Sequence, residues 1–144
     1  MYSCKKPDKN FPDEPQIEFL NFEPKGDSAV LTIGFQDGNG DIGIEDDDTS
    51  VDFNMFIDYY EKDDQDGWIQ QVDGLGDPIT FRYRLPILEP NGTDKSLEGE
   101  IDILMEPTYF HPISPDNDTL RYDIYLIDRA GNQSNVVTSP EIYR

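Results

Sequence analysis

The sequence has few cationic side chains and only one cysteine. It contains 11 lysine and arginine residues against 31 aspartate and glutamate residues, which gives a formal net charge of −20. Nucleic-acid binding depends on lysine and arginine contacts to phosphates, so this balance argues against a nucleic-acid partner. The same charge disfavours docking on anionic lipid. A single cysteine cannot form an internal disulfide, which excludes a disulfide-linked scaffold.

Long apolar runs and helix-forming stretches are also missing. No apolar segment approaches the roughly 20 residues that a membrane-spanning helix needs, and alanines are few. By contrast, aromatic residues make up 12% of the chain, which also has 11 glycines and 11 prolines. Such a composition is typical of short strands joined by turns. The 144 residues predict one domain, residues 16–144, after a polar tether at residues 1–15.

Apolar and polar residues alternate along much of the chain, which predicts an all-β antiparallel sandwich. The alternation is clearest at residues 51–60, where Val51, Phe53 and Met55 are separated by Asp52 and Asn54. A period of two indicates a half-buried strand. Turn residues recur about every ten positions, as in sandwiches of about seven or eight strands. The expected strands are residues 16–22, 29–35, 51–60, 68–72, 79–85, 97–105, 120–127 and 136–142.

Two expectations concern how these strands are joined. Arg82 and Arg84 would face the acids of residues 97–105 across a hairpin, which favours direct pairing of those two strands. The second expectation concerns the end of the sandwich at which Asp128 lies, which depends on the number of strands between residues 51–60 and 120–127. If residues 68–72 are not a separate strand, the count is even, and Asp128 and Asn132 approach the loop that follows residues 29–35 and could complete a binding site there. If residues 68–72 are a separate strand, the count is odd, and Asp128 lies at the opposite end of the sandwich from that loop.

That loop, residues 37–48, reads Asp-Gly-Asn-Gly-Asp-Ile-Gly-Ile-Glu-Asp-Asp-Asp. Three oxygen-bearing side chains alternate with glycines, which lets a short loop curl around a point. A hard cation such as calcium needs about six to eight oxygen ligands at roughly 2.4 Å. The sequence therefore predicts a calcium site, the alternative being an acidic turn that faces water. The candidate metal ligands are Asp37, Asn39, Asp41, Glu45, Asp48 and Asp128.

The loop begins like the calcium-binding EF-hand but departs from it. Its sixth position is Ile42 instead of glycine, its twelfth is Asp48 instead of glutamate, and no helices are expected beside it. A second acidic turn at residues 62–66 and the single histidine, His111, are interpreted as ordinary surface features. No nucleotide-binding or catalytic motif is present. The sequence thus predicts a protein that is not an enzyme.

Cys4 stands at the head of the polar, proline-rich tether and follows Ser3. This arrangement resembles the mature start of bacterial lipoproteins, in which a small residue precedes a lipidated cysteine. The resemblance covers about a tenth of the chain. It implies a lipid anchor at Cys4 as the only link to the membrane and a place in the bacterial cell envelope, as an outer-membrane lipoprotein.

Near the carboxyl end, residues 122–135 read Tyr-Asp-Ile-Tyr-Leu-Ile-Asp-Arg-Ala-Gly-Asn-Gln-Ser-Asn. This run resembles the last hairpin of bacterial immunoglobulin-like and fibronectin-III-like domains. The resemblance is confined to about 20 residues, and it places Tyr122 where such domains often have a corner tyrosine. It implies an immunoglobulin-like β-sandwich and carries no catalytic residue.

Three aromatic residues are candidates for a ligand platform. Phe56 and Tyr60 fall on the outward face of their strand, and Trp68 follows closely in the sequence. Exposed aromatic side chains can stack on sugars, although packing under another strand is the alternative. The combined expectation is a monomeric envelope lipoprotein that binds a protein or glycan partner and is stabilised by calcium. The alternatives are a carbohydrate-binding accessory domain and a structural spacer.

Overall fold

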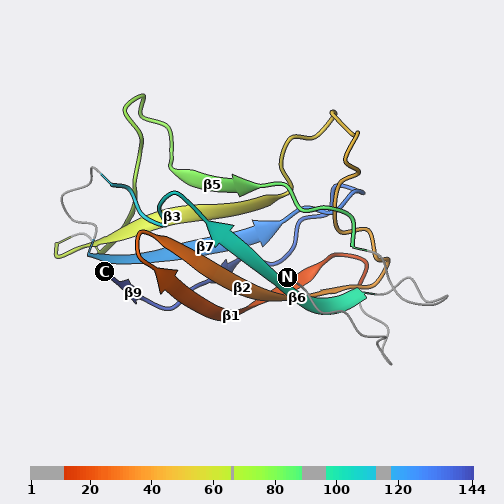
Figure 1. The fold of residues 1–144 in the computed structure, drawn as a ribbon, viewed down its shortest axis with the longest axis horizontal. Helices are drawn as coiled ribbons and strands as arrows, with labels where there is room; N and C mark the ends of the chain where they lie inside the picture. The colour runs from red at the N-terminus through yellow and green to blue at the C-terminus, as the bar shows by residue number, and fades with distance from the viewer. Residues whose placement is uncertain (1–11, 66, 89–96, 113–117) are drawn as a thin grey trace.

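The computed structural model describes residues 12–65, 67–88, 97–112 and 118–144. Cys4 therefore lies outside the described residues. Over these ranges the chain forms strands and no helix (Figure 1). The strands are β1 (Gln16–Lys25), β2 (Ser28–Asp37), β3 (Met55–Asp63), β4 (Gly67–Gln70), β5 (Thr80–Tyr83), β6 (Leu97–Met105), β7 (Thr119–Leu126), β8 (Val137–Thr138) and β9 (Ile142–Tyr143).

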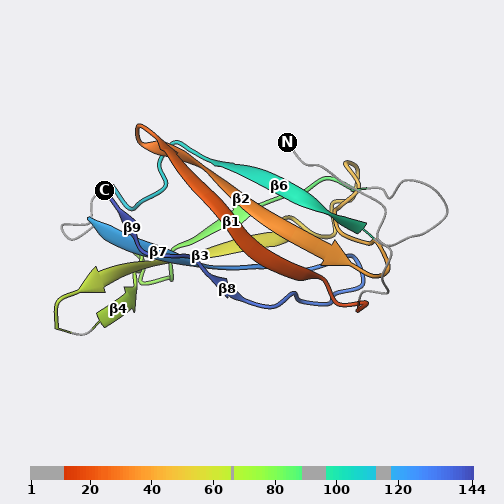
Figure 2. The same cartoon turned by 90° about the horizontal axis from the view of Figure 1, so that it is seen from below.

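The strands form two antiparallel sheets that pack face to face. One sheet has the order β1-β2-β6, and the other has the order β4-β3-β7-β8, with β5 also on β3 and β9 also on β7. Figure 2 shows the first sheet as one layer and β3 and β7 in the other layer. The predicted all-β antiparallel sandwich is confirmed. The more specific immunoglobulin-like resemblance stays a prediction.

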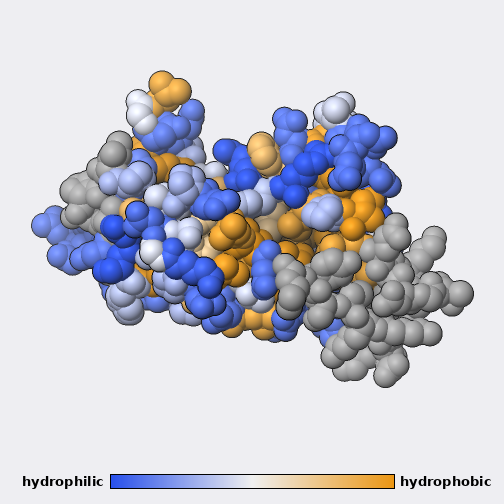
Figure 3. Space-filling view, in the orientation of Figure 1, coloured by the Kyte–Doolittle hydropathy of each residue, from blue (hydrophilic) through white to orange (hydrophobic). Residues whose placement is uncertain are grey.

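The core lies between the sheets because alternate side chains of each long strand point inward. Leu31 and Ile33 of β2, Ile57 of β3 and Ile124 of β7 are fully buried. Tyr122 is buried as well, and its hydroxyl donates a hydrogen bond to the main-chain carbonyl of Tyr109. The outer surface is mostly hydrophilic, with an apolar area near the middle of the face in Figure 3.

β4 and β5 lie end to end along the same edge of β3. β4 pairs with the second half of β3 and β5 with the first half, both antiparallel. Between them, residues 72–78 form a small hairpin, closed by the Val72–Pro78 bridge, which leaves Leu75 89% exposed at its tip. The chain resumes at once, because Ile79 N donates to the Gln71 carbonyl at 2.8 Å. Residues 67–83 therefore act as one interrupted strand, and the strand count becomes even.

Two details of the predicted strands were wrong. β3 begins at Met55, and Val51 and Phe53 are 45% and 44% exposed. Asn54, expected to face outward, is buried, and its side chain bonds to the main-chain N and O of Leu85 at 2.7 and 3.2 Å. This buried amide anchors the chain before β3, so the apolar alternation at 51–53 belongs to a loop.

The predicted hairpin between residues 79–85 and 97–105 was also wrong. β5 pairs with β3, and β6 pairs with β2 from Asp37 opposite Leu97 to Ala29 opposite Met105. Arg84 instead donates to the main-chain carbonyls of Glu45, Asp48 and Val51. Its cation therefore fixes the acidic loop through three carbonyl groups.

Candidate metal centre

The loops after β2 and after β7 meet at one end of the sandwich. β2 and β7 both run toward this end, because β4 and β5 act as one strand and the number of strands between β3 and β7 is even. The main-chain N of Arg129 donates to the Asp41 carbonyl at 3.0 Å, and Ala130 N donates to Asp41 Oδ2 at 3.2 Å. The Arg129 guanidinium also donates to the carbonyls of Ile42 and Gly43. The two loops, about 90 residues apart in sequence, are thus held together by main-chain contacts.

Three carboxylates converge where these loops meet. Asp37, Asp41 and Asp128 each offer an oxygen, and these oxygens lie within 4.8 Å of one another. Asp37 has no exposed surface and Asp128 is 5% exposed. Asp37 ends β2 of one sheet, whereas Asp128 follows β7 of the other. The cluster therefore bridges the two sheets.

Local hydrogen bonds hold each carboxylate in place. The Asp37 oxygens accept from the main-chain N of Asn39 at 3.4 Å and of Asp41 at 3.0 Å. Gly40, with φ of +67°, turns the chain between those two residues. Asp128 accepts from the main-chain N of Asn132 at 2.8 Å and from its side-chain Nδ2 at 3.2 Å. The predicted approach of Asn132 thus orients Asp128.

Two oxygen atoms of the cluster region are buried without a hydrogen-bond donor. They are Asn39 Oδ1 and Asp41 Oδ1. Leaving a buried polar atom unpartnered costs about 1–3 kcal/mol, so native structures almost always satisfy such atoms. Both atoms belong to the alternating residues in which the sequence predicts ligands. Their chemistry, neutral amide oxygen and carboxylate oxygen, suits a hard cation.

Burial disfavours the charged forms of Asp37 and Asp128. Burial, with the neighbouring Asp41 as the second cause, raises the pKa of Asp37 from 3.8 to about 7. Burial also raises the pKa of Asp128, against the opposing effect of the Asn132 hydrogen bonds. In the absence of a metal, Asp37 therefore takes up a proton as the pH falls through about 7. A divalent cation would compensate the same charges, so protons and metal compete for the site.

Glu45 and Asp48 are not part of the cluster. Arg84 holds their main-chain carbonyls, and Glu45 is exposed. The Asp48 carboxylate accepts from the N and Oγ of Ser50, and these bonds, with a smaller effect of Arg84, lower the pKa of Asp48. In the second acidic turn, the Asp63 carboxylate likewise accepts a local hydrogen bond, from the main-chain N of Gln65.

The structure does not unite the three aromatic candidates. Phe56 stacks on Tyr125 across β3 and β7, with ring centroids 5.2 Å apart. Tyr60 and Trp68 share another partner, the Arg121 guanidinium, whose central carbon lies 5.6 and 4.7 Å from their ring centroids. Because a cation already covers these rings, the residues do not form the single flat platform that sugar stacking would use.

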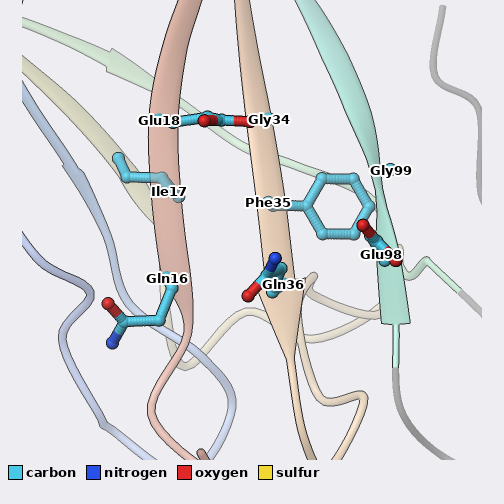
Figure 4. Close-up of a pocket in the computed structure, with 8 residues that line it drawn as sticks. All are labelled: Gln16, Ile17, Glu18, Gly34, Phe35, Gln36, Glu98 and Gly99. Atoms are coloured by element: carbon cyan, nitrogen blue, oxygen red, sulfur yellow. The ribbon is translucent and has the colours of Figure 1, made fainter. Parts of the chain in front are cut away.

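A shallow hollow of about 200 Å³ lies on the three-stranded sheet (Figure 4). It is lined by Gln16, Gln36, Glu18 and Glu98, and Gly34 leaves space on the central strand. The Glu18 side chain extends over this glycine, where an added Cβ would meet Glu18 Cγ and Oε1 at 3.0 Å. The Glu18 side chain therefore occupies the space that Gly34 leaves on the central strand.

Comparisons with protein-family models, with curated proteins and with solved structures found no match to this chain. Along the described ranges, the structure contains no helix long and apolar enough to cross a membrane. Arg129, which donates to the loop after β2, did not stand out in the sequence, whereas Asn132 of the same Asp-Arg-Ala-Gly-Asn turn was expected near that loop together with Asp128.

Proposed function

We propose that the protein is a non-catalytic β-sandwich module that binds calcium at one end. Asp37, Asp41 and Asp128 would supply carboxylate oxygens, and Asn39 would supply an amide oxygen. The observation that carries the proposal is the meeting of three acids from two loops beside buried oxygen atoms that lack donors. Calcium would link the end of β2 to the end of β7 and so stabilise the contact between the sheets.

The ligand chemistry favours calcium over other metals. The cluster offers oxygen only, without the histidine or cysteine that zinc and later transition metals prefer. Magnesium demands a near-ideal octahedron and retains several waters, whereas calcium accepts the irregular geometry of a flexible loop. Main-chain carbonyls or water would complete the coordination shell. Extracellular modules that bind calcium in this way often have dissociation constants of about 10⁻⁴–10⁻³ M.

Calcium should raise the melting temperature of the protein. At a free calcium concentration of about 100 times the dissociation constant, linkage predicts about 2.7 kcal/mol of stabilisation. For a domain of this size the gain corresponds to about 10 °C. Thermal melting followed by circular dichroism, with calcium varied at constant ionic strength, measures the effect. Asp128→Asn should lose the response, whereas Asp46→Asn, an exposed acid of the same loop, should keep it. An unchanged melting temperature at about 100 mM calcium, which is about 100 times the weaker of these dissociation constants, would remove the metal from the proposal.

We further place the module at the bacterial cell envelope, anchored through lipid on Cys4, where it would bind a partner. The support is the resemblance of the tether, with Cys4 after Ser3, to the mature start of bacterial lipoproteins. Expressed from its natural coding sequence in a bacterium, the protein should incorporate labelled palmitate, and Cys4→Ser should abolish the label. Absence of label in the unsubstituted protein would contradict the anchor without affecting the calcium site.

A further inference from the structure

The four edges of the two sheets differ in how they are protected from pairing with another strand. β1 has a register shift between Phe19 and Asn21, and the Asn135 side chain bonds both the N and the O of Ile17. In the other sheet, one edge consists of the interrupted β4 and β5, and the opposite edge of β8 and β9, two residues each. Bulges, interruptions and short strands are common means of blocking an edge.

β6 lacks these protections. It has nine residues, its register with β2 has no shift, and in the described part of the chain it pairs with β2 alone. A long, regular edge strand presents a row of main-chain donors and acceptors to an incoming strand. β6 is therefore the edge most suited to strand addition.

An apolar groove of about 280 Å³ runs beside this edge. Its walls come from the segment after β5 and from β6, and we call it the β6 groove. The apolar side chains that line it are Tyr83, Leu85, Leu88, Ile101, Ile103 and Leu104. Leu104 is 49% exposed. Arg84, the cation in the lining, already donates to three carbonyls.

The outward side chains of β6 limit the choice of partner. Glu98, Glu100 and Asp102 alternate along the strand on its outer face, followed on that face by Leu104. Asp102 also lines the groove and accepts from Thr32 Oγ1 at 2.8 Å, so Glu100 is the most exposed of the three acids. A second copy of this chain would bring the same acids close together, which is unfavourable for like charges on neighbouring strands. An incoming strand with lysine or arginine at every second position would instead meet opposite charges. Its intervening apolar side chains would face the β6 groove.

We propose that β6 binds an extended segment of a partner protein in which basic and apolar residues alternate. Main-chain hydrogen bonds to the β6 edge would give affinity, and the groove and the acids would select the sequence. This proposal deepens the partner-binding part of the proposed function and does not depend on calcium. Either test can therefore fail without deciding the other.

The test uses an acetylated nine-residue peptide of alternating lysine and valine as the probe. In about 0.15 M salt, where distant charges are screened, it should bind, and hydrogen exchange should show protection of the amides of Leu97–Met105. A peptide of the same composition with all lysines adjacent should bind about tenfold more weakly, as should one methylated at alternate main-chain nitrogens. The methylated peptide has the same charge, so it separates strand addition from simple attraction to an acidic protein.

Glu100→Lys should weaken binding of the alternating peptide about tenfold. Glu100 is exposed, so the substituted domain should still fold. The matched control is Glu23→Lys on β1, which makes the same charge change on the protected edge of the same sheet and should leave binding unchanged. Equal binding of all three peptides, protection outside β6, or self-association of the protein through β6 in sedimentation would overturn the proposal.

Discussion

Asp37→Asn should stabilise the protein without calcium and abolish its stabilisation by calcium. The raised pKa of Asp37 means that the folded state favours the protonated acid. This contribution to stability is fully present below pH 3.8 and is lost as pH rises through about 7. At pH 8 an ionised, buried Asp37 therefore destabilises the fold. The asparagine oxygen can keep the shorter bond, from Asp41 N at 3.0 Å, and loses only the longer one, from Asn39 N at 3.4 Å. The melting temperature should therefore rise by a few degrees.

In the presence of calcium, the effect of Asp37→Asn on stability reverses, because the metal binds the ionised carboxylate. The unsubstituted protein should be stabilised, whereas Asp37→Asn should bind calcium about 100-fold more weakly, since affinity follows the charge of the ligand set. Melting at pH 8 with and without calcium measures both effects. Asp46→Asn is the control and should show neither. If Asp37→Asn lowers the melting temperature without calcium and still responds to it, the acid is not a ligand.

Asn54→Ala should be strongly destabilising, by about 2–4 kcal/mol. The Asn54 side chain is the hydrogen-bond acceptor for Leu85 N and also donates to the Leu85 carbonyl. The Leu85 carbonyl also accepts from Ile44 N at 3.0 Å, so it keeps a hydrogen bond when the Asn54 side chain is removed. The main loss is therefore the hydrogen bond of the Leu85 N–H group. Alanine would leave this N–H buried without a partner beside a small cavity.

Urea denaturation measures the free energy of unfolding for this comparison. Asn21→Ala is the matched control, because Asn21 is an exposed asparagine of β1. The control should lie within about 0.5 kcal/mol of the unsubstituted protein. A similarly small change for Asn54→Ala would show that the Leu85 contacts contribute little, and that another feature anchors the start of β3.

The strands that the sequence predicted well are those with one buried and one solvated face. β6 matches the predicted residues 97–105 at both ends, because its alternation begins and ends with the strand. The start of β3 was misplaced because Val51 and Phe53 continue the same period in an exposed loop. Periodicity alone cannot tell an apolar loop residue from a strand residue. Only the buried contacts of Asn54 mark the boundary.

Pairing could not be predicted from charge. With 31 acids in the chain, Arg82 and Arg84 have complementary partners on almost any strand. The hairpin with residues 97–105 was therefore one of several arrangements that charge allows. The tertiary contacts decided among them, because Arg84 finds three carbonyls in the acidic loop.

The candidate metal centre has a local and a long-range part. Asp37, Asn39 and Asp41 were proposed as ligands from their spacing alone, because alternating residues of a short loop lie close together. Asp128 depended on whether β4 and β5 count as one strand, which the sequence left open. Glu45 and Asp48 were included as candidate ligands because they are acidic. Acidity alone does not tell whether a side chain points toward the cluster.

The interruption between β4 and β5 gives the chain a natural insertion point. β3 fixes the register on both sides of residues 72–78, so the segment between these strands does not determine how either one pairs. Its tip is highly exposed at Leu75, and none of its residues lines the β6 groove or belongs to the three-carboxylate cluster. An epitope or fluorescent reporter placed there would follow the protein in cells while sparing both proposed binding regions.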